Sequence, residues 1–137
     1  MIYLLDRSAL GRIRTSDVVA QALRPLYAAC VVATCTAIDL QAGCSARDAA
    51  HYRRIARAQH RVVRLSMGLD VQLRALHVQE RLARAARRRD ITPAHLLIAA
   101  CAEIHGATLL HYDRAFDHIA GVTGQPSLWV APPGSVP

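Results

Sequence analysis

The chain has 137 residues, which is enough for one domain with a substantial hydrophobic core. Its formal net charge is +7 and all seventeen basic residues are arginine, a balance that favours an acidic partner such as nucleic acid or an acidic protein. No apolar run approaches the length of a transmembrane helix, and the N-terminus lacks the features of a signal peptide, so we expect a cytoplasmic protein that does not contact a membrane. The four cysteines lack zinc-ribbon spacing and are expected to be buried free thiols.

The N-terminal part of the chain alternates short apolar runs with helical patterns. Residues 2–5 predict a first strand that ends at Asp6, and a short helix is expected over about residues 9–14. Residues 31–33 predict a second strand, which leads into a helix that carries Asp39. Between these strands lies another helix, and its expected buried stripe comprises Val18, Val19, Ala22, Leu23 and Leu26.

Two amphipathic helices are expected next, over residues 46–64 and residues 69–88. The side chains expected to be buried are Tyr52, Ile55, Ala56, Val62 and Val63 in the first helix and Val71, Ala75, Val78 and Leu82 in the second. Their opposite faces carry arginine stripes, Arg53, Arg57, Arg61 and Arg64 in the first and Arg74, Arg81, Arg84 and Arg88 in the second. Such a stripe either follows the phosphates of RNA or is an ordinary solvated face, and both interpretations stay open. The RNA-binding candidates are Arg53, Arg57, Arg81 and Arg84.

The last third of the chain predicts a helix from Pro93, a buried strand over residues 107–110, and a polar turn that opens another helix. Asp113 falls just past the carboxyl end of this strand, and Asp117 follows one helical turn later. Ligands bind at this end of the strands in open α/β sheets. Residues 127–130 predict one further strand at the edge of the sheet.

Strand-then-helix units over residues 1–137 predict a single three-layer α/β/α domain with a small, mainly parallel sheet. This topology could bring Asp6, Asp39, Asp113 and Asp117 to one edge of the sheet. Clustered carboxylates repel one another, and a hard divalent ion such as Mg²⁺ or Mn²⁺ removes that conflict. The chemistry that follows from such a site is hydrolysis of a phosphodiester by a metal-activated water.

Four segments of the chain resemble PIN-domain ribonucleases, in particular the VapC toxins of bacterial VapBC toxin–antitoxin systems. Residues 1–10 are similar to the opening Asp-Thr-Ser-Ala segment of that family, and residues 39–43 are similar to its Glu-x-x-x-Gly helix. Residues 95–100 resemble its Asp-Leu-Leu-Ile-Ala-Ala segment, and residues 106–120 resemble its closing strand and acidic turn. The fold that the resemblance implies is the three-layer PIN-like domain already expected from the strand and helix pattern.

The resemblance also implies a function, that of an Mg²⁺- or Mn²⁺-dependent RNA endonuclease that acts as a toxin. It further implies a homodimer and inhibition by a cognate VapB-type antitoxin. The residues that it assigns to the site are Asp6, Asp39 and Asp113 as catalytic acids, of which Asp6 and Asp113 bind the metal, with Ser8, His95 and Asp117 in supporting roles.

Three residues depart from the family pattern. Asp39 stands where the family usually has Glu, Arg7 replaces the usual Thr, and His95 occupies the position of an acidic ligand. The histidine removes one negative charge and one hard oxygen ligand, so we expect either a nuclease weakened by His95 or a degenerate PIN domain that binds RNA or antitoxin without cleaving. A third alternative is a zinc protein that recruits His95, His111 and His118, although no close Cys/His spacing supports it.

Overall fold

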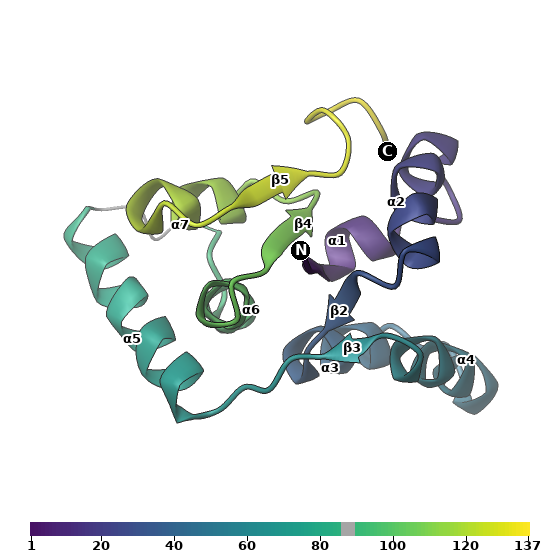
Figure 1. Cartoon of the computed structure of the whole chain (residues 1–137), viewed down its shortest axis with the longest axis horizontal. Coiled ribbons are helices and arrows are strands. Elements are labelled where there is room, and N and C mark those ends of the chain that lie inside the picture. The colour runs from purple at the N-terminus through teal and green to yellow at the C-terminus, as the bar shows by residue number, and fades with distance from the viewer. Residues whose placement is uncertain (86–89) are drawn as a thin grey trace.

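The computed structural model describes residues 1–85 and 90–137, and Figure 1 shows its arrangement of strands and helices. The described elements, in chain order, are β1 (Tyr3–Leu5), α1 (Arg7–Leu10), α2 (Asp17–Ala28), β2 (Val32–Thr34), α3 (Thr36–Cys44), α4 (Ala49–His60), β3 (Val63–Arg64), α5 (Leu69–Arg84), α6 (Pro93–Ile104), β4 (Thr108–His111), α7 (Ala115–Thr123) and β5 (Ser127–Trp129). The expected continuation of a helix to residue 88, with Arg88 exposed, lies outside the described residues. Every helix in the described ranges is too short or too polar to cross a membrane.

The strands form one parallel sheet in the order β3-β2-β1-β4-β5. In its centre, Leu4 of β1 pairs with Ala33 of β2 on one side and with Leu109 of β4 on the other. The chain therefore builds outward from β1 through β2 to β3, and then returns to the opposite side of β1 to add β4 and β5. The predicted mainly parallel sheet is confirmed, and the reversal between β1 and β4 creates a switch point at which ligands bind in such sheets.

Helices cover both faces of the sheet, which confirms the predicted three layers. Leu4 and Leu109 belong to the core that packs under α3, α5, α6 and α7. Their chain neighbours Leu5 and Leu110 belong to the second core, under α1 and α2, because successive strand side chains point to opposite faces. In Figure 1 the helices of the smaller layer, α1 and α2, lie to the right of β4 and α5 lies at the left.

The helix α6 sits in the larger core and is buried on most sides, as its apolar sequence predicts. Pro93 occupies its first turn, and Thr92 caps it by accepting a hydrogen bond from the His95 amide. After the helix, Gly106 has a φ of +66°, a left-handed conformation that glycine adopts without strain. This conformation turns the chain into β4, so the strand ends at the switch point.

Some boundaries and burial expectations are wrong. The helix α4 ends at His60, and residues 63–64, expected to be helical, form β3, because Val63 is β-branched and finds an open edge beside Ala33 of β2. The side chains expected to be buried that are exposed instead are Val18, Ala22, Tyr52 and Val63. The short helix expected over residues 9–14 is α1, which begins earlier and ends at Leu10.

The four cysteines are free thiols, as expected, but only two of them are buried. Cys35 and Cys101 lie in the larger core, whereas Cys30 and Cys44 are exposed. An apolar sequence context therefore does not predict burial by itself, because Cys44 lies in α3, which packs on the sheet, and is still exposed.

The buried stripe predicted for α5 is confirmed at all four positions, Val71, Ala75, Val78 and Leu82. The helix also has a second apolar stripe that points to solvent. Its members are Leu69, Leu73 and Leu76, whose side chains are 67%, 56% and 63% exposed. Spacings of four and three residues place these leucines along one side of the helix, so α5 presents a continuous apolar surface.

Candidate active site

Two of the predicted acids lie at the switch point of the sheet. Asp6 directly follows β1, and Asp113 lies two residues beyond the end of β4. The two strands are parallel neighbours, and the Asp6 amide extends their ladder by donating to the Leu110 carbonyl at 2.9 Å. The carboxyl ends of the strands, and with them Asp6 and Asp113, therefore share one edge of the sheet.

Asp6 is held by the first turn of α1. Its Oδ2 accepts hydrogen bonds from the Ser8 amide at 2.9 Å and from the Ser8 hydroxyl at 2.6 Å. The Ser8 hydroxyl oxygen in turn accepts from the Tyr112 amide at 2.9 Å, just after β4. Asp6 is only 4% exposed, so these bonds fix a buried carboxylate and tie the end of β1 to the end of β4.

Asp113 is held by two donors, one for each carboxylate oxygen. The Ala115 amide donates to Oδ1 at 2.9 Å at the start of α7, and His95 Nε2 lies 2.9 Å from Oδ2. Partial burial raises the pKa of Asp113, but the bonds from Ala115 and His95 outweigh it, so the net pKa lies below its ordinary value. Asp113 is therefore a carboxylate at neutral pH, and it is about one-third exposed.

His95 joins the start of α6 to Asp113. Its Nδ1 accepts a hydrogen bond from the Thr92 amide at 2.9 Å, which completes a capping box in which histidine takes the usual place of Glu or Gln. Because Nδ1 accepts, the ring proton of the neutral imidazole sits on Nε2 and is donated to Asp113. The histidine thus points into the site and serves as a donor there, where an acid would serve as an acceptor.

Asp39 makes its contacts on another side of α3. Its Oδ1 accepts from Thr34 Oγ1 at 2.7 Å and from Gln59 Nε2 at 2.9 Å, and its Oδ2 pairs with Arg64 Nη2 at 2.5 Å. These partners belong to β2, α4 and β3. Asp39 lines a cavity of 210 Å³ between α3 and α4, and within the described ranges it shares no hydrogen bond or ion pair with Asp6 or Asp113.

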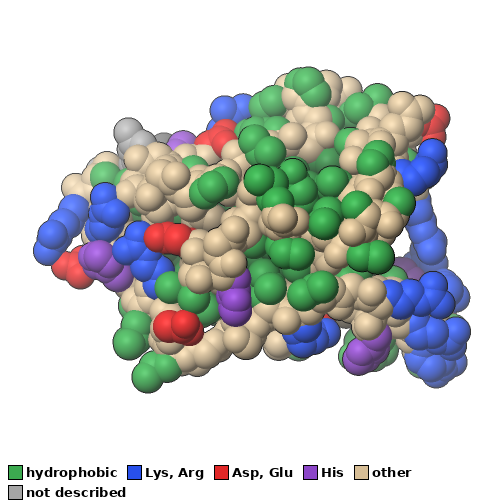
Figure 2. Space-filling model, in the orientation of Figure 1, with side chains coloured by type: hydrophobic (Ala, Val, Ile, Leu, Met, Phe, Trp, Pro, Cys, Tyr) green, Lys and Arg blue, Asp and Glu red, His purple; other side chains and the backbone are tan. Residues whose placement is uncertain are grey.

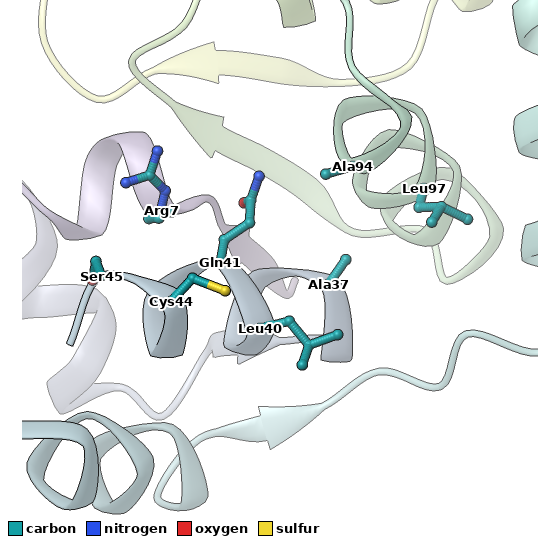
Figure 3. A pocket seen from close by; sticks show the side chains of 8 residues that line it. All are labelled: Arg7, Ala37, Leu40, Gln41, Cys44, Ser45, Ala94 and Leu97. Atoms are coloured by element: carbon teal, nitrogen blue, oxygen red, sulfur yellow. The ribbon is translucent and has the colours of Figure 1, made fainter. Parts of the chain in front are cut away.

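A larger cleft, of 560 Å³, opens between α1, α3 and α6. Figure 3 shows the Gln41 side chain extending from α3 toward the space between Arg7 of α1 and Ala94 of α6. Its Oε1 is buried and has no hydrogen-bond partner among the described residues. Arg7 follows Asp6 and Ala94 precedes His95, so the cleft adjoins the switch point.

The chain matches a family model for the PIN domain over residues 3–122. It is a PIN-domain protein. Among curated relatives, ribonuclease VapC51 of Mycobacterium tuberculosis is 40% identical over 134 residues, which cover 98% of this chain and 96% of the relative. Ribonuclease VapC21 of the same species is 37% identical over 134 residues, which cover 97% and 96%. Within the PIN domains, the chain therefore belongs to the VapC family.

Solved structures share the fold of this PIN domain. DNA-bound VapBC from Salmonella typhimurium superposes with a TM-score of 0.75 and 14% identity, covering 96% of this chain and 99% of that one. VapBC2 from Rickettsia felis, bound to a DNA fragment from its promoter, gives a TM-score of 0.76 and 16% identity, covering 94% and 98%. At such identities these likenesses establish the arrangement of helices and strands alone.

Two further candidate residues, Asp117 and His111, both contact Trp129. Asp117 is exposed, and both its oxygens lie 3.0 Å from Trp129 Nε1. His111 is fully buried, its ring centroid is 5.1 Å from those of Phe116 and Trp129, and its Nδ1 accepts from the Asp113 amide. Residues 1–85 and 90–137 hold no group of three His, Cys, Asp or Glu side chains suited to a metal, so the zinc alternative gains no support.

Several residues around the site were not predicted from the sequence. Gln41 lies two positions from Asp39, and residues two apart on an α-helix point about 200° away from each other, so helical geometry alone could have separated them. Gln59 and Arg64, the partners of Asp39, come from elements that contact α3 only after folding. Their roles depend on tertiary contacts that no local pattern encodes.

His111 provides a test of this packing through the pH dependence of stability. Burial lowers the pKa of His111 from its ordinary 6.5, although Asp117, Asp6 and Asp113 oppose the shift. As pH falls below about 6.5, the unfolded chain takes up a proton that the folded chain refuses, so this contribution to stability is present at higher pH and lost on acidification. We expect His111→Gln to flatten the decline in the urea midpoint between about pH 7.5 and about pH 5.5. Parallel pH profiles for the two proteins would contradict this assignment.

Proposed function

We propose that this chain is a metal-dependent RNA endonuclease and the toxin of a VapBC-type pair. The observation that carries the proposal is the placement of Asp6 and Asp113 at the carboxyl ends of neighbouring strands β1 and β4, in a chain of the VapC family. The names of the relatives supply the reaction, since both are ribonucleases. The net charge of +7 suits a polyanionic substrate.

The donor atoms near the switch point fit Mg²⁺, or Mn²⁺ as its substitute. Asp6 and Asp113 would hold the ion, and one or two carboxylates together with water are often sufficient for Mg²⁺. The hydrogen bonds found for the Asp6 carboxylate all end on Oδ2, which leaves Oδ1 for another partner. The buried, unpaired Oε1 of Gln41 is a further oxygen in the adjoining cleft. When bound, such an ion supplies an activated water and stabilises the charge that develops on the phosphate.

The chain's own residues would orient the reacting groups. Ser8 keeps the Asp6 carboxylate in one position, and Arg7, exposed beside the cleft, is a suitable donor for a phosphate oxygen of RNA. His95 holds Asp113 but occupies one of its lone pairs, so a cation must compete with this hydrogen bond. Because this competition lowers the affinity for the cation, we expect a weakened nuclease. It is also compatible with the alternative, a degenerate PIN domain that binds RNA or antitoxin without cleaving.

RNA cleavage with and without Mg²⁺ or Mn²⁺ tests the proposal directly. We expect slow, metal-dependent cleavage by the natural chain, abolished by a chelator and reduced by at least ~100-fold in Asp6→Asn, which keeps the size of the side chain but removes its charge. Asp17→Asn, on the first turn of α2, removes a charge outside the site and is the matched control. Equal cleavage by the natural chain and Asp6→Asn would refute the assignment of Asp6.

His95→Asp, in the same assay, separates the weak nuclease from the degenerate domain. The change replaces a donor by a carboxylate and restores a hard oxygen ligand, so we expect cleavage to rise by at least ~10-fold, equivalent to about 1.4 kcal/mol of transition-state stabilisation. Cleavage that is absent before and after the change, with RNA binding intact, would favour the degenerate domain. Equal cleavage by both proteins at saturating Mg²⁺ would show that His95 is no handicap.

Of the two arginine stripes, the one on α4 is the better candidate for RNA binding. Arg53, Arg57 and Arg61 are exposed and form no ion pair within the described ranges. The fourth arginine of this stripe, Arg64, lies in β3 and pairs with Asp39. On α5, two arginines of the stripe are paired, Arg74 with Glu103 and Arg84 with Glu80, so a larger part of its charge is neutralised. Figure 2 shows basic side chains gathered at the lower right of the view, where Figure 1 places α4.

Charge reversal distinguishes the two stripes. We expect Arg53→Glu with Arg57→Glu to weaken RNA binding and to reduce its salt dependence, because arginines that neutralise phosphates release counterions. Arg81→Glu with Arg84→Glu, which changes the charge equally, is expected to have a smaller effect. Binding would be measured by fluorescence anisotropy over a range of salt concentrations. If only the α5 pair matters, α5 is the RNA track, and if neither matters, both stripes are ordinary solvated faces.

The partners proposed besides RNA are a second copy of the chain and a VapB-type antitoxin. The antitoxin follows from the family, and structural neighbours are described as VapBC assemblies. For the homodimer, the exposed stripe of Leu69, Leu73 and Leu76 on α5 is an apolar surface that a second copy would cover.

The dimer proposal predicts that Leu73→Asp yields a monomer, because a charge would be buried in the interface. Val18→Asp, at a position that is 56% exposed on α2, is the matched control and is expected to leave the dimer intact. Light scattering at micromolar concentrations provides the measurement. A natural chain that is already monomeric under these conditions would contradict the proposal.

A further inference from the structure

The helix α3 directs polar side chains into two different spaces. Asp39 lines the cavity of 210 Å³ beside α4, whereas Gln41 lines the cleft of 560 Å³ beside α1 and α6. Because the two residues point about 200° apart on the helix, α3 cannot direct both toward the same ligand. Asp39 and Gln41 are therefore alternatives for one position in the site.

The side of α3 that carries Asp39 is occupied by packing against α4 and β3. Three donors, from Thr34, Gln59 and Arg64, already satisfy the Asp39 carboxylate. One helical turn later, a Cβ at Gly43 would lie 3.0 Å from Cε2 of Tyr52, a contact so tight that the tyrosine ring would have to shift by a few tenths of an ångström. Asp39 and Gly43 thus both act in the packing of α3 against its neighbours. Gly43 allows Tyr52 of α4 to approach closely, and Asp39 binds Arg64 and Gln59.

The side of α3 that carries Gln41 lines the cleft beside α1 and α6. The cleft is bounded by Arg7 and Ala94, which adjoin Asp6 and His95 in the chain, and Figure 3 shows the Gln41 amide between them. A buried acceptor without a donor is uncommon in folded proteins. The unpaired Oε1 of Gln41 is the kind of atom that a bound cation, or a water held by it, would satisfy.

We infer that Gln41, rather than Asp39, is the α3 residue of the metal site. The inference rests on the proposed function and refines its donor set to two carboxylates, Asp6 and Asp113, and one carboxamide oxygen. An amide oxygen is an acceptable ligand for Mg²⁺ or Mn²⁺, but it contributes no negative charge. The chain therefore lacks an acidic ligand at two positions, Gln41 and His95, and its affinity for divalent ions is correspondingly low.

The test is the affinity for Mn²⁺ alone, measured by titration calorimetry, with thermal melting of each protein in parallel. Gln41→Glu adds a full charge at the site and is expected to tighten Mn²⁺ binding by at least ~10-fold, and to enlarge the rise in Tm that Mn²⁺ produces. Gln79→Glu makes the same change on the exposed face of α5 and is expected to do neither. Asp39→Asn is expected to lower the Tm, because Arg64 loses its partner, while the affinity for Mn²⁺ stays the same.

If Asp39→Asn folds poorly, Arg64→Gln breaks the same ion pair and leaves the carboxylate. An Asp39 that belonged to the metal site would then be freed and Mn²⁺ binding would strengthen, whereas the inference expects no change. Two results together would overturn the inference: Asp39→Asn loses affinity for Mn²⁺, and Gln41→Glu binds Mn²⁺ no more tightly than Gln79→Glu. In that case Asp6→Asn still abolishes Mn²⁺ binding, so the proposed metal site itself remains. If Asp6→Asn also leaves Mn²⁺ binding unchanged, the proposed metal site fails, and the inference fails with it.

Discussion

The junction between β1 and β4 is the constraint on which the other features of the molecule depend. Its strands lie side by side although some hundred residues separate them, and the chain Asp6–Ser8–Tyr112 joins their ends through three hydrogen bonds. Ser8 is the centre of this connection, because its hydroxyl donates to the acid and accepts from the backbone beyond β4. Without this link, the order of strands would still bring the two acids to one edge, but neither their orientation nor their separation would be fixed.

Each acid around the sheet edge has been given donors within the protein. Ser8 donates to Asp6, His95 donates to Asp113 and Arg64 pairs with Asp39, so each carboxylate has a partner within the protein. These interactions reduce the electrostatic repulsion expected between carboxylates that the fold brings to one edge of the sheet. They also mean that a cation bound to Asp113 competes with the hydrogen bond from His95, so its affinity is sensitive to substitution of this histidine.

Much of the fold could be predicted because it follows from local periodicity. The burial of α6, the turn at Gly106 and the buried stripe of α5 depend on patterns within one segment. Prediction failed where the secondary structure of a residue depends on a neighbouring element. The local pattern predicts a helix at Val63, and only the free edge of β2 explains why the residue forms a strand. The candidate site divides in the same way. Strand ends located Asp6 and Asp113 beside one another, whereas the surroundings of Asp39 are set by residues twenty and more positions away.

The capping box of α6 has a consequence for the linkage between binding and local folding. One imidazole both closes the first turn of the helix, through Nδ1, and holds Asp113, through Nε2. Helix caps of this kind contribute about 0.5 to 2 kcal/mol. Anything that draws Asp113 away from the ring thereby changes the fraying of the α6 N-terminus, and fraying there changes the freedom of Asp113 by the same amount. Occupancy of the sheet edge and order in the first turn of α6 are in this way thermodynamically reciprocal.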